Sequence, residues 1–95
     1  MAEPFDDPIR PVEIEHSIDA IFVEGRMEQY YNFFDYHFEQ GDGYCRARSY
    51  ADEMDKVVVH GPFAARDDLR TIENAAFEHA VHAYLKRRYR AVQSR

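Results

Sequence analysis

Residues 12–24 alternate between apolar and polar side chains with a period of two. One side collects Ile14, Ile18 and Phe22, and the other side is mainly acidic. Strict alternation over this length is typical of a strand with one buried face. The spacing of Ile14, Ile18 and Ile21 also fits a helix. We favour the strand because the next segment offers a matching partner.

Three further strands are predicted by the sequence that follows. Residues 28–39 are dense in aromatic side chains, which favour strands. Residues 44–51 alternate again, and residues 56–60 form a short valine-rich strand that we expect Gly61-Pro62 to end. The connecting turns contain glycine or acidic residues and lie at residues 25–27, 40–43 and 52–55.

The register of the second hairpin follows from two independent criteria. Pairing Glu39 with Tyr44 sets large aromatic residues opposite small ones, as a sheet needs where a helix approaches it. These pairs are Phe38 with Cys45, Tyr36 with Ala47 and Phe34 with Ser49. The same register sets Asp35 opposite Arg48, and opposite charges across two strands stabilise a sheet.

In the first hairpin we pair Glu24 with Glu28 across a three-residue loop. This register aligns Ile18 with Phe34 and places the apolar residues of both strands on one face. The other aligned pairs are Phe22 with Tyr30 and Ile14 with Phe38. We expect a helix to pack on this face.

One long C-terminal helix, residues 67–93, is predicted to cover that face. Asp67 or Asp68 can cap its start. Its apolar positions form one broad stripe of Leu69, Ala76, Phe77, Ala80, Val81, Tyr84 and Leu85. Residues 1–11 hold three of the four prolines and are interpreted as an extended arm. The sequence therefore predicts an α+β fold, a four-stranded antiparallel meander with one helix, in a single domain of residues 12–95.

Composition limits the class of protein. A chain of 95 residues with 45% hydrophobic residues fits one domain with one core. The single cysteine, Cys45, cannot form an internal disulfide, so we expect a reducing, cytoplasmic compartment. The acidic, proline-broken start predicts no signal peptide, and no apolar run is long enough to span a membrane.

The net charge of −6 is divided unevenly along the chain. Residues 1–60 carry 14 acidic and 5 basic residues (−9), whereas residues 61–95 carry 4 acidic and 7 basic residues (+3). The basic excess is concentrated in Lys86, Arg87, Arg88, Arg90 and Arg95. Such polarity favours self-association or an acidic partner. A basic cluster around Tyr89 could bind nucleic acid. We do not expect it, because the acidic chain opposes general affinity for phosphates, but this alternative stays open.

The histidines do not form a catalytic or metal-binding motif along the chain. They are His16, His37, His60, His79 and His82. His79 and His82 have ligand spacing on a helix, but a zinc site needs further ligands, and the register places His37 on the face away from the helix. His16 is expected to be a hydrogen-bonded residue at the edge of the core. We therefore expect no catalytic residue, no metal and no cofactor.

The helix-free face of the sheet gathers apolar and aromatic residues. On the chosen registers they are Ile21, Tyr31, Phe33, Tyr50 and Val58, with Asp35 and Arg48 beside them. A solvated sheet face is normally polar, so a contiguous patch of this kind marks an interface. We predict a small non-catalytic interaction or regulatory module that forms a homodimer or binds another protein through this face.

Three other interpretations stay open. The arm at residues 1–11 could cover the patch, which would then be a satellite core. The histidines and tyrosines at the seam between sheet and helix could bind a small ligand or catalyse a reaction. The acidic residues 13–28 could mimic nucleic acid, as an inhibitor would.

Overall fold

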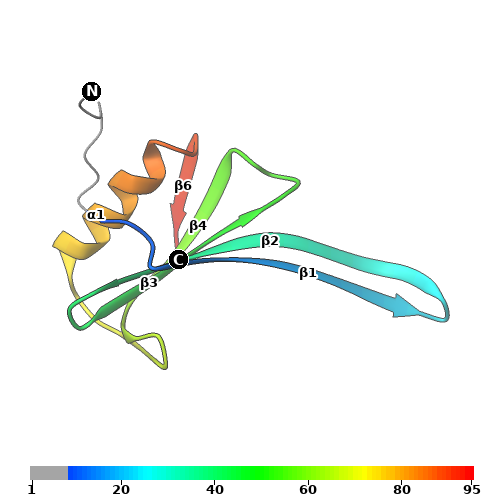
Figure 1. The fold of residues 1–95 in the computed structure, drawn as a ribbon, viewed down its shortest axis with the longest axis horizontal. Coiled ribbons are helices and arrows are strands. Elements are labelled where there is room, and N and C mark those ends of the chain that lie inside the picture. Colours follow the sequence, from blue (N-terminus) through cyan, green and yellow to red (C-terminus); the bar gives the residue numbers. More distant parts are fainter. Residues whose placement is uncertain (1–8) are drawn as a thin grey trace.

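The structure is a computed structural model that describes residues 9–95. Within that range the chain forms six strands and one helix. They are β1 (Glu13–Val23), β2 (Arg26–Gln40), β3 (Gly43–Tyr50), β4 (Lys56–Ala65), β5 (Asp68–Thr71), α1 (Ala75–Lys86) and β6 (Ala91–Ser94). The sheet order is β1-β2-β3-β4-β5 with antiparallel neighbours, and β6 pairs in parallel with β4. The predicted α+β class, an antiparallel sheet with one helix, is confirmed (Figure 1).

The predicted meander of four strands is wrong in strand number, because the sheet of the described residues has six strands. β4 does not end before Gly61 but continues to Ala65, and the chain then turns back to pair with it as β5. Gly61 lies inside β4 with a φ of 113°, a conformation that glycine adopts far more easily than other residues. Gly61 thus lets the strand bend and continue where the sequence suggested a stop.

The predicted long helix at residues 67–93 is also wrong, because α1 has only 12 residues. Its cap is Asn74, whose side-chain oxygen accepts a hydrogen bond from Phe77 N at 3.1 Å, and not Asp67 or Asp68. Residues 68–71 and 91–94 pair with β4 instead. Helix propensity is a weak preference that such pairing overrides. No helix of the described residues is long and apolar enough to cross a bilayer.

The predicted register of the β2–β3 hairpin is confirmed, from Glu39 with Tyr44 to Phe33 with Tyr50. In the β1–β2 hairpin the prediction is wrong by two residues, because Ile18 pairs with Asn32 instead of Phe34. The chain turns at two residues, Glu24 and Gly25, rather than over residues 25–27, and a bulge follows Ile21. A shift of two residues leaves every side chain on its predicted face up to the bulge.

The core lies between α1 and one face of the sheet. Its buried members are Ile9, Phe38, Cys45, Ala47, Val57, Val59, Phe77, Ala80, Val81, Tyr84 and Leu85. Ile9 comes from the segment predicted as an extended arm, so the described end of that segment, residues 9–11, enters the core region. Residues 1–8 of the predicted arm lie outside the described residues.

Ile18 and Phe22 were predicted to lie beneath the helix, but they are 60% and 63% exposed. The reason is that β3 ends at Tyr50, opposite Phe33, and Ala51 bonds only to Asn32, so the part of β2 before Asn32 pairs with β1 alone. The outer part of the hairpin, residues 18–32, is a two-stranded ribbon that extends well beyond the helix (Figure 1). The radius of gyration of 15.3 Å accordingly exceeds the roughly 12 Å of a compact chain of this length.

Candidate functional site

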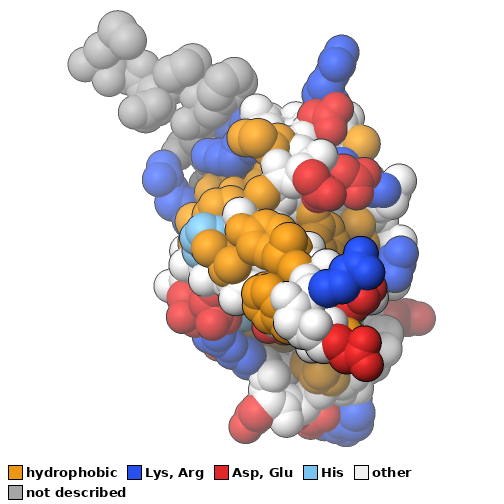
Figure 2. All heavy atoms as spheres, turned by 90° about the vertical axis from the view of Figure 1, so that its right-hand side faces the viewer, with side chains coloured by type: hydrophobic (Ala, Val, Ile, Leu, Met, Phe, Trp, Pro, Cys, Tyr) orange, Lys and Arg blue, Asp and Glu red, His pale blue; other side chains and the backbone are white. Residues whose placement is uncertain are grey.

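Exposed apolar side chains gather on the ribbon, residues 18–32. Of the eleven large hydrophobic residues that are exposed in the described chain, seven lie there. They are Ile18, Ile21, Phe22, Val23, Met27, Tyr30 and Tyr31. Val12 and Ile14 add to the same surface just before the ribbon begins. Figure 2 looks onto the end of the ribbon and shows hydrophobic side chains gathered together with charged groups around them.

The helix-side face of the ribbon is the part that the sequence analysis missed. Ile18 and Ala20 share this face with their partners Asn32 and Tyr30. His16 also lies here, where its ring stacks on Phe34 with centroids 4.4 Å apart. The alternating pattern identified these positions as apolar. It did not reveal that, within residues 9–95, these positions on the ribbon lie beyond the reach of α1 and of any third strand.

The predicted patch lies on the opposite face, where the strand pairings bring its residues together. Tyr31 and Phe33 follow Ile21 on this face through the β1–β2 register, and Tyr50 follows through the β2–β3 register. Ile21 and Tyr31 are 41% and 37% exposed, whereas Phe33, Tyr50 and Val58 are half-buried. The patch is therefore most open where it runs onto the ribbon.

The flanking charged pair of the patch is held tightly. Arg48 donates to both carboxylate oxygens of Asp35 and also lies over the ring of Phe33, 4.0 Å from its centroid. Phe33 and Tyr50 meet edge to face, with centroids 5.7 Å apart. Asp35 is only 7% exposed. This part of the face is ordered by contacts within the chain, so it can present Tyr50 and Phe33 without rearrangement.

A hollow of about 470 Å³ lies where the ribbon leaves the body. Its lining comes from the ribbon residues of β2 nearest the body and from the end of β3 with the turn after it. The residues are Tyr30, Tyr31, Asn32, Tyr50, Ala51, Asp52 and Glu53. A backbone hydrogen bond from Ala51 N to Asn32 O, 2.8 Å long, joins the two lining segments. The hollow is an open notch between the ribbon and the turn, and its tyrosines could receive side chains of a partner.

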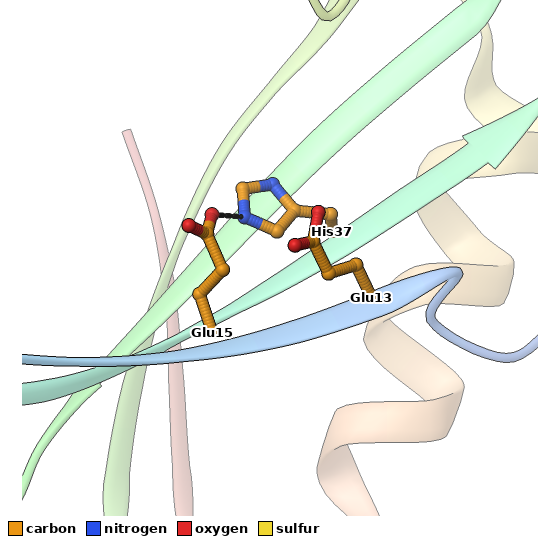
Figure 3. A group of neighbouring side chains, drawn as sticks. All are labelled: Glu13, Glu15 and His37. Atoms are coloured by element: carbon orange, nitrogen blue, oxygen red, sulfur yellow. Dashed lines mark hydrogen bonds and ion pairs between the residues drawn. The ribbon is translucent and has the colours of Figure 1, made fainter.

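A second group of polar residues lies on the helix-free face near the start of β1. Glu13 and Glu15 of β1 and His37 of β2 point toward one another, with ligand atoms within 4.8 Å (Figure 3). His37 Nε2 lies 2.5 Å from Glu15 Oε1, and its Nδ1 lies 2.7 Å from the hydroxyl of Tyr44. The sequence analysis missed this group, although residues 13 and 15 of one strand share a face with His37.

Arg66 decides what this polar group can do. Its guanidinium lies 2.6 Å from Glu13 Oε1 and 3.2 Å from Glu15 Oε1, so it already supplies the positive charge that a cation would bring. A metal ion would have to displace Arg66 from both carboxylates. The contacts instead join the end of β4 to β1 across two intervening strands, and we interpret the group as a brace for the sheet.

Two further histidines, His16 and His82, each contact one polar side chain. His16 Nε2 lies 2.5 Å from the side-chain oxygen of Asn32, and His82 Nε2 lies 3.0 Å from the hydroxyl of Ser94. Burial, followed by the charges of Arg46 and Arg48, lowers the pKa of His60. Tyrosines at the seam between sheet and helix bond to each other, because the hydroxyl of Tyr89 donates to that of Tyr36 at 2.7 Å.

Two members of the basic cluster, Lys86 and Arg88, lie at the end of α1. Arg88 donates to the backbone oxygen of Tyr84 at 2.8 Å, and its guanidinium lies 3.6 Å from the centroid of the Tyr84 ring. Lys86 is the last residue of α1, where a positive charge favours the helix dipole. Lys86 and Arg88 therefore each have a structural role at the helix end.

Comparison with protein-family models, with curated proteins and with solved structures found no match for this chain. The functional argument therefore depends on the residues of the chain itself. The feature that they offer is the ribbon, with apolar side chains on both faces.

Proposed function

We propose that this protein is a non-catalytic interaction module that associates with a second copy of itself through the ribbon, residues 18–32. The observation that supports this proposal is the position of the exposed apolar residues. Seven of the eleven in the described chain lie on one two-stranded projection. Apolar surface of this extent on one projection of a small domain marks an interface.

The stability of the ribbon also favours a partner. A two-stranded hairpin is only marginally stable in water by itself, and it needs a further strand or a packed face. In the described chain the ribbon has neither, since Ile18 and Phe22 are exposed on its outer part. A partner that covers these side chains would supply the missing contacts.

The chemistry of the surface fits a protein partner. Tyr30 and Tyr31 border the hollow beside the ribbon, and Phe33 and Tyr50 continue the aromatic surface onto the body. Aromatic residues are enriched where interfaces contribute most binding energy. A symmetric dimer is the commonest assembly of small proteins. Asp35 and Arg48, at the edge of this surface, would set the orientation of the partner more than its affinity.

Light scattering coupled to size exclusion tests the proposal. We expect the wild-type chain to elute as a dimer and Phe22→Glu to elute as a folded monomer, because the substitution places a charge in the interface. Leu69→Glu is the matched control, since Leu69 is 59% exposed on β5, away from the ribbon. It should remain a dimer. A wild-type chain that stays monomeric up to millimolar concentration would refute the proposal.

A further inference from the structure

The open edge of β1 has a defined pattern of free backbone groups. Ala51 N donates to Asn32 O, so the N–H and C=O of Asn32 point toward β3. In an antiparallel pair, when the backbone N–H and C=O of one residue point away from the neighbouring strand, those of the residue directly opposite also point away from it, toward the other side. Ile18 is the partner of Asn32, so the N–H and C=O of Ile18 point to the open edge. By alternation, those of Ile14, His16 and Ala20 do the same.

This edge lacks several of the features that usually protect a terminal strand, and its charged residues are three carboxylates, Glu13, Glu15 and Asp19. β1 forms one end of the sheet and runs for 11 residues. It contains no proline and no lysine, the residues that natural proteins place on edges to prevent pairing. The bulge in the β1–β2 pair places its extra residue, Glu28, on β2. β1 itself therefore runs without an inserted residue. Within residues 9–95 no strand pairs with this edge, so that part of the chain leaves it open to another strand.

The charge pattern of β1 selects one symmetric pairing. Ile18 is the midpoint of Glu13–Val23. Antiparallel pairing of two β1 strands about Ile18 uses the whole strand and places no acidic residue directly opposite another. Moving the axis to Ser17 sets Glu15 opposite Asp19, and moving it to Asp19 sets two aspartates opposite each other. Like charges directly opposite destabilise a sheet.

The same register also matches the apolar side chains. On the helix-side face it sets Ile18 opposite Ile18 of the second copy and Ile14 opposite Phe22. On the other face it sets Glu15 opposite Ile21, so the apolar match is confined to the helix-side face. Cross-strand pairs of large apolar residues stabilise a sheet, and Ile14, Ile18 and Phe22 are all more than half exposed in the single chain.

From these observations we infer that β1 pairs with β1 of a second copy, antiparallel, about a two-fold axis at Ile18, and so joins the two sheets into one. The inference depends on the proposed self-association and specifies its geometry. Five outward-facing positions, from Ile14 to Phe22, would supply about ten hydrogen bonds between the two chains. The ribbon of each copy would then have a third strand, which is the contact that it lacks.

Cysteine cross-linking tests the register. In Ile18→Cys the two introduced thiols face each other with Cα atoms about 5.5 Å apart, which a disulfide can bridge. In Ser17→Cys each thiol faces Asp19 of the other copy, and the two thiols lie about 8 Å apart, beyond disulfide reach. The native Cys45 is fully buried and gives little background. A mixture of Ser17→Cys and Asp19→Cys chains should cross-link, since these positions face each other.

The outcomes separate this inference from the proposed function. We expect Ile18→Cys to form a covalent dimer under mild oxidation, and Ser17→Cys alone to form at least tenfold less. If light scattering shows a dimer but Ile18→Cys does not cross-link, the pairing is wrong and self-association stands. If Ser17→Cys cross-links as well as Ile18→Cys, the axis at Ile18 is wrong. If the wild type is a monomer, both proposals are wrong.

Discussion

Arg48 donates two hydrogen bonds to Asp35, from Nε at 2.7 Å and from Nη2 at 2.9 Å. The two residues are direct partners in the β2–β3 hairpin. Their side chains are 26% and 10% exposed, so the pair is largely shielded from water. It fixes the register of this hairpin and holds Phe33 beneath the guanidinium of Arg48.

We expect Arg48→Met to lower the free energy of unfolding by about 1.5–3 kcal/mol, since it leaves a buried carboxylate without its charged donors. Arg70→Met is the control. Arg70 also pairs with its aspartate, Asp68, but its side chain is 78% exposed, and exposed pairs contribute little to stability. Urea unfolding of the two variants measures the difference. Equal losses would show that burial does not strengthen the Arg48 pair.

The contrast between two phenylalanines tests where the core ends. Phe38 is fully buried against α1, and Phe22 on the ribbon is 63% exposed. Phe38→Ala should lower the free energy of unfolding by roughly 3–5 kcal/mol, as for other buried aromatic residues. Phe22→Ala should change the free energy of unfolding of the monomer by about 0.5 kcal/mol at most. Thermal unfolding at low protein concentration compares them. A large loss for Phe22→Ala would show that the ribbon packs on the body.

The sequence allowed the β2–β3 hairpin to be predicted because two criteria selected one register. Large residues faced small ones on one side, and Asp35 faced Arg48 on the other. The β1–β2 hairpin offered only alternation, and a pattern with a period of two cannot distinguish registers that differ by two residues. That ambiguity explains why Ile18 was paired with Phe34 instead of Asn32.

The length of the final helix could not be predicted locally. Residues 68–71 and 91–94 have acceptable helix propensity, and their positions depend on backbone groups of β4 that are far away in the sequence. The candidate site shows the same limit. Alternation placed Ile21, Tyr31 and Phe33 on one face, but the exposure of the ribbon depends on β3 ending at Tyr50.

The stability of the domain should fall at mildly acidic pH because of His60. Its pKa is lowered mainly by burial, and then by Arg46, Arg48 and Arg95. The unfolded chain, with the ordinary pKa near 6.5, therefore binds a proton more readily than the folded chain. The stabilisation is complete above about pH 6.5 and is lost as the pH falls toward the lowered pKa of the folded state.

His60→Gln removes this contribution. We expect the free energy of unfolding of the wild type to fall more between pH 7.5 and pH 5.5 than that of the variant. Urea unfolding at the two pH values measures both changes. His82, whose pKa is also lowered by burial, remains in both proteins and cancels in the comparison. Parallel pH dependences for the two proteins would exclude His60 as the cause.

The turn at the tip of the ribbon offers a way to stabilise it. Glu24 and Gly25 have φ values of 53° and 79°, and two successive positive values are the mark of a type I′ turn, which prefers Asn-Gly. A glutamate in this conformation is disfavoured by about 1 kcal/mol, and asparagine tolerates it better. Glu24→Asn should slow amide exchange in residues 19–31 of the monomer severalfold and leave exchange in α1 unchanged. Glu28→Asn makes the same chemical change in β2, at the bulge and outside the turn, and should not slow exchange. Equal protection from both variants would mean that the lost negative charge, and not the turn, stabilises the ribbon.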